Sequence, residues 1–283
     1  MVKIISDSTC DLSQELLERY DIAVLPLQVT LGEESYEDGV NITVDEIYQW
    51  ADENKTTPKT AAPAMETAAG VLAPWLEKGM DLICFSVSES MSTSANVMRL
   101  AAKELKATDR VTVIDSQNLS TGGGLLVIEA AILAKEGKSA EEITAYAKAL
   151  RPLVRSSFVV DTLTYLHRGG RCSSVAALAG GMLKLHPKIV VADGKMGVSK
   201  KYRGKMTRVL PEYVEDMKEE LLNSHKERVF ITHSGCTQET IDQVKTILEG
   251  LNHFDEILIT RAGSVISSHC GPGTLGVLFI ANE

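Results

Sequence analysis

Apolar and polar positions in the first half of the chain follow two alternating patterns. Short runs of apolar, often β-branched residues predict a strand over Val2–Ser6 and buried strands over Leu82–Val87 and Val111–Ile114, and Ile22–Thr30 is predicted to be extended. Helices are predicted to begin at Asp11, Thr43 and Ser139, each followed three residues later by Gln or Glu, and a helical pattern covers Ser94–Leu105. Strands that alternate with helices predict an α/β domain with a mostly parallel sheet.

The second half of the chain carries a different pattern. Ile189–Ala192 and Met196–Ser199 flank Asp193-Gly194, a pair typical of a tight hairpin turn. Apolar periodicity predicts helices over 211–223 and 238–248, and strands over 229–232, 257–260 and 276–280. At roughly 150 residues per domain, the chain of 283 residues is expected to form two α/β domains, 1–155 and 156–283.

Composition excludes several classes of protein. Apolar residues make up 44% of the chain and charged residues 24%, as in globular proteins generally. No apolar run reaches the roughly 18 residues of a membrane-spanning helix, and the segment Met1–Asp7 turns polar too early for a signal peptide. The five cysteines are scattered without a CxxC pair. This pattern favours a cytoplasmic location and argues against a disulfide framework or a structural zinc site.

Charge is unevenly distributed along the chain. The formal net charge is −9, yet residues 184–208 carry eight basic residues against the single acid Asp193 and therefore +7, which leaves −16 for the rest. An acidic body argues against general nucleic-acid binding. The basic segment is compatible with an acidic partner, with a phosphate group or with an ordinary solvated hairpin.

Several catalytic and nucleotide-binding motifs can be excluded. Gly137-Lys138-Ser139 resembles the end of a P-loop, but Ile132 occupies the position of its first glycine. Gly271–Gly276 matches GxGxxG, but only seven residues follow it, too few for a βαβ unit. Neither a G-x-S-x-G elbow nor an H-E-x-x-H pair is present. The segment His233–Cys236 lacks a second pair of metal ligands, so a core or loop role is favoured.

Four polar loops remain as candidates, because α/β proteins bind ligands in loops that follow strands. These loops are Ser6–Leu12, Thr57–Pro63, Ser86–Ser94 and His269–Gly273. Three of them also have a simpler explanation: a helix cap at Asp11, an ordinary proline loop and a structural histidine. The six hydroxyls of Ser86–Ser94 exceed what one helix cap needs. Together, Thr60, Ser92 and His269 would form a set of donors suited to a carboxylate.

A pair of arginines is a further candidate. Arg168 and Arg171 flank the diglycine Gly169-Gly170. Guanidinium groups bind carboxylates and phosphates bidentately, so the pair could serve an anionic ligand or partner. Two exposed arginines at a turn are the simpler explanation.

Taken in order along the chain, these stretches resemble the DegV family of bacterial fatty-acid-binding proteins. The matching stretches are Ser6–Leu12, Pro58-Lys59-Thr60 with Pro63, Met91-Ser92, Val113–Ser116, Arg168–Arg171, and His269 with Gly271-Pro272-Gly273. Each stretch is weak alone, but the ordered set covers nearly the whole chain and is specific.

The resemblance implies a fold and a function. It implies two α/β domains that hold one long-chain fatty acid between them. It also implies a non-catalytic carrier that presents the acyl carboxylate to a separate ATP-dependent fatty-acid kinase, whose acyl-phosphate product feeds phospholipid synthesis. No metal or cofactor is expected, and transient contact with a membrane surface is compatible with this role.

Family positions carry over to individual residues of this sequence. The resemblance implies that Thr60, Ser92 and His269 bind the carboxylate, that Ser8, Thr93 and Gly271 add contacts, and that Arg168, Arg171 and Arg203 meet the kinase or the transferred phosphate. The sequence departs from the family pattern at Thr93, Ala61, Ala62 and Ala95, where the family has Gly, Ser, Gln and Tyr. Met91, Phe158, Met182 and Leu183 are equally compatible with an acyl tunnel and with ordinary core.

Two other functional classes stay open. With Ser92 as nucleophile, His269 as base and Asp7 or Asp115 as the orienting acid, the protein would be an acyl hydrolase or acyltransferase. The missing nucleophile elbow argues against this class. A phosphosugar or nucleotide module that uses the basic segment has no phosphate loop to support it.

Overall fold

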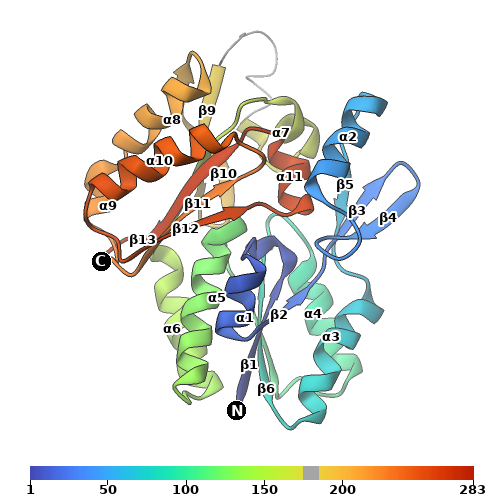
Figure 1. Ribbon diagram of the computed structural model, residues 1–283. Helices are drawn as coiled ribbons and strands as arrows, with labels where there is room; N and C mark the ends of the chain where they lie inside the picture. The colour runs from blue at the N-terminus through green and yellow to red at the C-terminus, as the bar shows by residue number, and fades with distance from the viewer. Residues whose placement is uncertain (175–184) are drawn as a thin grey trace.

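A four-stranded parallel sheet forms the centre of the first half of the chain (Figure 1). The structure is a computed structural model, and it describes residues 1–174 and 185–283. The sheet consists of β1 (Val2–Asp7), β2 (Ile22–Leu25), β6 (Asp81–Ser86) and β7 (Val111–Asp115), in the order β2-β1-β6-β7. Every neighbouring pair is parallel, which confirms the α/β prediction.

Helices cover both faces of this sheet (Figure 1). One face carries α3 (Met65–Glu77) and α4 (Ser94–Glu104), and the other carries α1 (Gln14–Tyr20), α5 (Ser120–Lys135) and α6 (Ala140–Leu150). Apolar residues face the helices on both sides, with Ile5 and Leu82 packed toward α3 and α4 and Ile4 and Ile83 toward α5. Burial on both faces explains why these strands are continuous apolar runs.

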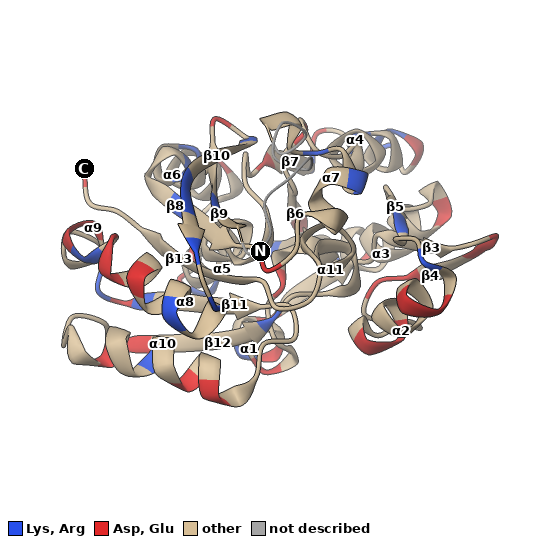
Figure 2. Ribbon diagram, turned by 90° about the horizontal axis from the view of Figure 1, so that it is seen from above, with Lys and Arg blue, Asp and Glu red and all other residues tan. Residues whose placement is uncertain are grey.

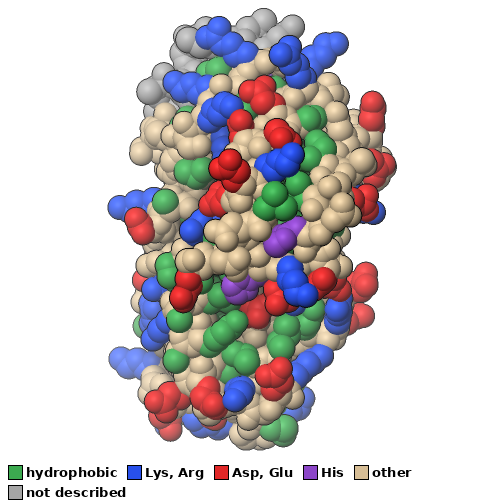
Figure 3. All heavy atoms as spheres, turned by 90° about the vertical axis from the view of Figure 1, so that its left-hand side faces the viewer, with side chains coloured by type: hydrophobic (Ala, Val, Ile, Leu, Met, Phe, Trp, Pro, Cys, Tyr) green, Lys and Arg blue, Asp and Glu red, His purple; other side chains and the backbone are tan. Residues whose placement is uncertain are grey.

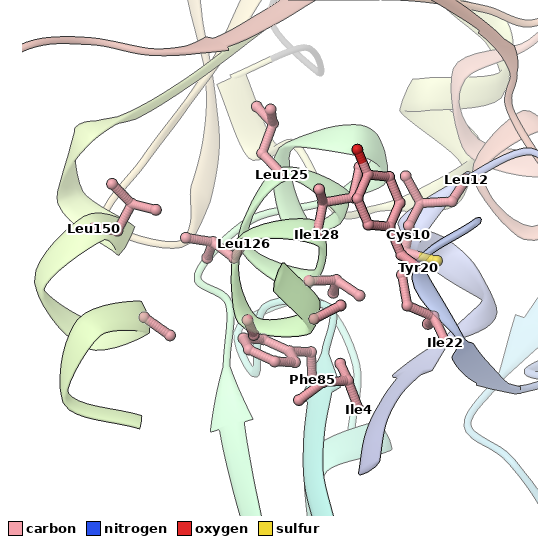
Figure 4. Packing of buried hydrophobic residues seen from close by; sticks show 14 of the residues in the cluster. Ile4, Cys10, Leu12, Tyr20, Ile22, Phe85, Leu125, Leu126, Ile128 and Leu150 are labelled. Carbon is pink, nitrogen blue, oxygen red and sulfur yellow. The ribbon is translucent and has the colours of Figure 1, made fainter. Parts of the chain in front are cut away.

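Helix α5 lies between the first sheet and a second one. Ten of its first eleven residues are buried, and its cluster joins Phe85 of β6 to Phe230 and Leu278 of the second sheet. Figure 4 shows Leu125, Leu126 and Ile128 of this helix among core residues of the first sheet and of α6. A helix that is buried on all sides has no polar face, so the sequence carries no amphipathic pattern there.

The second sheet is six-stranded and mixed. It consists of β8 (Val154–Val159), β9 (Leu185–Ala192), β10 (Lys195–Arg203), β11 (Arg228–His233), β12 (Glu256–Arg261) and β13 (Leu275–Ile280), in the order β10-β9-β8-β13-β11-β12. Only β11 and β12 pair in parallel. The predicted hairpin is confirmed, with positive φ at both Asp193 and Gly194.

Three helices cover the outer face of this sheet (Figure 1): α8 (Met206–Glu215), α9 (Lys218–Leu222) and α10 (Gln238–Gly250). The single helix predicted over 211–223 is therefore wrong, because the chain breaks at Asp216 and Met217 and α8 begins five residues earlier. The predicted division at residue 155 falls inside β8, which begins at Val154 and pairs with β13 over its whole length. The domain boundary stays a prediction.

A small lobe is inserted after β2. It contains β3 (Gln28–Leu31), β4 (Glu34–Glu37), α2 (Val44–Asn54) and β5 (Lys59–Ala61), with its strands in the antiparallel order β4-β3-β5. Seen from above, α11 (Ser264–Cys270) lies between this lobe and the six-stranded sheet (Figure 2). The predicted extended run Ile22–Thr30 is in fact two strands of different sheets, separated at Pro26 and Leu27.

Helix starts test the capping predictions. Thr43 and Ser139 form complete capping boxes with Glu46 and Glu142, as predicted. The predicted cap at Asp11 is wrong: Ser13 caps α1, and Asp11 has a left-handed backbone with φ 50°.

Within residues 1–174 and 185–283, none of the helices combines the length and apolar character needed to cross a bilayer.

Candidate functional site

A cavity of about 390 Å³ opens at the carboxyl ends of the parallel strands. Thr9 follows β1, Val87 follows β6 and Leu119 follows β7, and all three line it. The opposite wall comes from the six-stranded sheet and from α11. The cavity therefore lies between the two sheets, at the edge where α/β folds bind ligands.

Most of the cavity wall is apolar. Met91, Phe158, Leu166, Met196, Ile266 and Leu278 are among its lining residues. Met91 and Phe158 thus form part of a cavity wall, whereas Met182, Leu183 and Lys184 lie outside the described residues. A volume of this size with an apolar lining and a few polar groups is typical of a small-molecule site.

The polar end of the cavity is built around a hydrogen bond between Thr60 and His269. Thr60 belongs to β5 of the small lobe, and His269 lies near the end of α11, 209 residues later. The Thr60 Oγ1 and His269 Nε2 atoms are 2.7 Å apart. The other ring nitrogen, Nδ1, is buried without a partner among the residues the structure describes. The fold alone brings these two predicted site residues together.

The unpartnered nitrogen indicates how the protons are arranged. A buried N–H without an acceptor costs more than an unfilled nitrogen lone pair, so the ring proton is favoured on Nε2. His269 then donates to Thr60 Oγ1, and the Thr60 hydroxyl is free to donate to a ligand. The pair therefore presents a hydroxyl donor to the cavity, which suits a carboxylate.

Gly169 packs against the His269 ring at its second nitrogen, Nδ1. A Cβ atom on Gly169, the last residue of α7 (Thr164–Gly169), would lie closer than 3.0 Å to His269 Nδ1. The backbone of α7 therefore packs directly against the imidazole. No side chain larger than a hydrogen atom fits between them.

Burial sets the protonation state of His269. Loss of solvation, together with the smaller effect of the positive charge of Arg171, lowers the pKa of this imidazole to about 4. The unfolded chain binds the proton near the ordinary pKa of ~6.5. The stability that this group contributes is therefore fully present above about pH 6.5 and is lost as the pH falls toward 4.

We expect the empty protein to keep His269 neutral from about pH 5.5 upward. A bound carboxylate should raise the pKa of this histidine, because negative charge favours the imidazolium form. A pH titration of the imidazole NMR signals, with His269→Gln to assign them, measures both values. A ligand-free pKa near 6.5 would contradict the geometry of the site.

The serine-rich loop after β6 contributes less than its composition suggests. Ser88 and Ser90 donate to the Gly194 carbonyl oxygen and so fix the loop to the β9–β10 turn. Ser92 and Thr93 line the cavity, and the Ser92 oxygen accepts from the Ser94 N–H at 3.2 Å, which leaves its own proton free. Thr93 has φ −91°, so the glycine of the family pattern is not required here.

The two arginines beside the diglycine occupy different places. Arg171 lines the cavity and donates to the Gly169 carbonyl oxygen at 2.7 Å and to the Met91 carbonyl oxygen at 3.5 Å. It thereby connects the Ser92 loop to the His269 end of the cavity. Arg168 is exposed at the end of α7 and does not line the cavity, and neither does Arg203 at the end of β10.

Two further candidates lie away from the cavity wall. Ser8 donates to Asp38 at 2.8 Å and accepts from the Leu27 N–H. Gly271 ends α11 with φ 74°, and its carbonyl oxygen accepts from Ser234. Of the alanine departures, Ala61 and Ala62 line the cavity, whereas Ala95 is buried in α4 outside it. Neither Ser8 nor Gly271 is among the residues that line the cavity.

Sequence reasoning missed the contribution of β11. Thr232, His233 and Ser234, at the end of this strand, all line the cavity. The residues of this segment match only a weak metal-binding pattern. Its position after a predicted strand is the same feature that identified the other loops, and it could have identified this one.

The geometry does not assemble a hydrolase triad. His269 bonds to Thr60 and not to Ser92, and its Nδ1 carries no carboxylate among the described residues. Asp7 accepts from Thr9 and from the Val87 N–H. Asp115 accepts from the Gln117 N–H of its own loop and from the Glu89 N–H of the loop after β6. The described residues also contain no group of three acidic, histidine or cysteine side chains placed to hold a metal.

Comparisons with known proteins agree with this architecture. Residues 1–282 match the family model described as "Uncharacterised protein, DegV family". A DegV domain-containing protein of Clostridium acetobutylicum is 33% identical over 281 residues, which cover 99% of this chain and 98% of that protein. Two solved structures are similar throughout. A fatty-acid-binding DegV family protein from Thermus thermophilus has a TM-score of 0.90 and 31% identity, with 99% of each chain covered. A stearic-acid-binding protein from Eubacterium ventriosum has a TM-score of 0.87 and 33% identity, with 99% of this chain and 98% of that chain covered.

Proposed function

Because this chain belongs to the DegV family, we propose that it binds one long-chain fatty acid in the cavity between its two sheets. The carboxylate lies against Thr60, Ser92 and the neighbouring His269, and the acyl chain follows the apolar wall. The observation that carries this proposal is the hydrogen-bonded pair of Thr60 and His269 at the polar end of an otherwise apolar cavity. Structures of DegV relatives with bound fatty acids support it.

The two ends of the ligand contribute differently to the free energy of binding. Each buried methylene contributes ~0.8 kcal/mol, so a chain of ~14 methylenes contributes roughly 11 kcal/mol before ordering costs. Hydrogen bonds to a charged carboxylate contribute about 1.5–3 kcal/mol each and must offset its loss of solvation. The acyl chain therefore sets most of the affinity, and the polar end sets the orientation.

We expect Ser92→Ala and His269→Ala to preserve the fold and to weaken fatty-acid binding. Ser92→Ala loses a carboxylate contact, and His269→Ala loses the hydrogen bond that orients the Thr60 hydroxyl toward the carboxylate. Each change should cost about 1–3 kcal/mol, which corresponds to roughly 5- to 150-fold in affinity. Titration with a fluorescent fatty acid measures the loss, and circular dichroism checks the fold. Unchanged affinity in both variants would contradict the placement of the carboxylate at this end of the cavity.

The orientation of the ligand suggests that the protein is a presenting subunit. We propose that a separate ATP-dependent kinase phosphorylates the bound carboxylate and that the acyl phosphate serves phospholipid synthesis. Arg171 combines a place in the cavity wall with an exposed position, which suits contact with the new phosphate. Arg168 and Arg203, exposed outside the cavity, suit contact with the kinase.

Surface charge supports a docking side. In Figure 3, Lys and Arg side chains gather toward the upper end of the molecule, whereas both signs are mixed lower down. Part of the basic segment is already compensated, because Lys200 pairs with Asp216 at 2.6 Å. Basic charge gathered on one side of an acidic protein steers association.

Charge reversal separates docking from binding. Arg168→Glu is expected to leave fatty-acid affinity within about twofold of wild type, because this side chain does not touch the cavity. Phosphorylation by the kinase should fall at least about tenfold, and wild-type phosphorylation should fall as salt is added. Kinase-dependent formation of acyl phosphate and fatty-acid titration are measured on the same preparations. Normal phosphorylation by Arg168→Glu would exclude this residue from the docking surface.

A further inference from the structure

The helix that carries His269 begins at two buried carboxylates from other parts of the protein. The Gly263 N–H donates to Asp11 Oδ1 at 2.8 Å, and the Ser264 N–H donates to Asp38 Oδ1 at 2.7 Å. No side chain of α11 itself caps this end. The first donors of α11 are therefore satisfied from outside the helix.

The two carboxylates come from two different parts of the fold. Asp11 lies between β1 and α1, beside the four-stranded sheet, and Asp38 follows β4 in the small lobe. Both are almost completely buried, at 5% and 3% exposed. The beginning of α11, which follows β12 of the six-stranded sheet, is thus the point where all three parts meet.

Each carboxylate is held at both of its oxygens. Asp11 Oδ2 accepts from the Ser120 hydroxyl at the start of α5, and Asp38 Oδ2 accepts from the Ser8 hydroxyl. A Cβ on Gly263 would lie 3.1–3.3 Å from oxygens of both acids, so both pack directly against this backbone. With both oxygens bonded, neither carboxylate can move without breaking a hydrogen bond.

The helix transmits this placement to the ligand site. His269 lies six residues after Gly263, about 9 Å along a helix with a rise of ~1.5 Å per residue. Gly169 on one side and Thr60 on the other leave the imidazole no room to compensate for a shift of α11. A small displacement at the beginning of the helix therefore breaks the hydrogen bond at its end.

We propose that Asp11 and Asp38 are positioning residues that fix α11 and thereby hold His269 against Thr60. The inference rests on the proposed fatty-acid function, and it adds a link between the three parts of the fold and the carboxylate site. What α11 requires at each position is an acceptor oxygen, which asparagine also supplies. Ser8, predicted as a ligand contact, acts through Asp38.

The test compares variants of the full chain by fluorescent fatty-acid titration and by the NMR signals of His269. Asp38→Ala is expected to weaken binding about tenfold and to shift the His269 signals, and Asp38→Asn to restore both to nearly wild-type values. Ser8→Ala, which releases only one oxygen of Asp38, should act in the same direction with a smaller effect, about threefold. It is the decisive variant if Asp38→Ala does not fold.

A matched control removes a cap that does not touch α11. Thr237 caps α10 on the outer face of the six-stranded sheet, so Thr237→Ala should lower the thermal midpoint while affinity and the His269 signals stay unchanged. Wild-type affinity and unmoved His269 signals in Asp38→Ala and Ser8→Ala would overturn the positioning role. Failure of the wild-type protein to bind would instead contradict the fatty-acid function, and the NMR comparison would still decide the role of the two acids.

Discussion

Gly169→Ala is expected to weaken fatty-acid binding by about 10- to 100-fold, the equivalent of about 1.4–2.8 kcal/mol. The new methyl group would lie closer than 3.0 Å to His269 Nδ1, so the ring must move away from Gly169. His269 then loses its hydrogen bond to Thr60 Oγ1, and the hydroxyl donor is no longer aligned with the carboxylate. Titration with a fluorescent fatty acid measures the effect.

Gly197→Ala is the matched control for this substitution. Gly197 lies in β10, and a Cβ there meets nothing within 4 Å. Its affinity should equal that of the wild type within about twofold. Equal affinities for both variants would mean that the ring of His269 moves without consequence and has no part in holding the carboxylate.

Gly122→Ala is expected to lower the free energy of unfolding by about 2 kcal/mol or more. In an ordinary helix interior, this substitution raises stability by up to about 1 kcal/mol. Here a Cβ would lie closer than 3.0 Å to Ser156 Oγ and to Asn118 Oδ1, because α5 is packed between the two sheets. Overpacking should therefore make this Gly→Ala substitution lower the free energy of unfolding instead of raising it.

Gly70→Ala is expected to raise the free energy of unfolding, the opposite of the effect of Gly122→Ala. Gly70 is exposed inside α3, and a Cβ there meets nothing within 4 Å. This variant should gain about 0.5–1 kcal/mol from helix propensity. Urea unfolding of the two variants beside the wild type measures both signs. A gain in stability for Gly122→Ala would mean that α5 is not packed tightly between the sheets.

The sequence predicted those parts of the fold whose patterns are local. Buried parallel strands such as β1 and β6 appear as continuous apolar runs because helices cover both of their faces. The hairpin at Asp193-Gly194 depends on two adjacent residues with positive φ, which their identities favour. Loops after such strands then indicate the edge of the sheet at which the cavity opens.

Other features depend on contacts between distant residues and leave no local pattern. Helix α11 is seven residues long and rich in β-branched residues and serine, and it is stabilised by carboxylates from elsewhere. Asp11 has the composition of a helix cap but serves a helix more than 250 residues away. The bond between Thr60 and His269 arises only when the lobe, α11 and α7 pack together. The sequence alone could name these two residues through the family resemblance but could not place them in contact.

The most direct test of the proposed carrier is mass spectrometry of the small molecules released when the purified protein is denatured. We predict a noncovalent long-chain fatty acid at about one molecule per chain, and an unmodified mass for the denatured protein. Lipid-stripped protein should take up an added long-chain fatty acid at the same ratio. Absence of a released fatty acid together with no uptake, or an acyl group covalently bound to Ser92, would contradict the account.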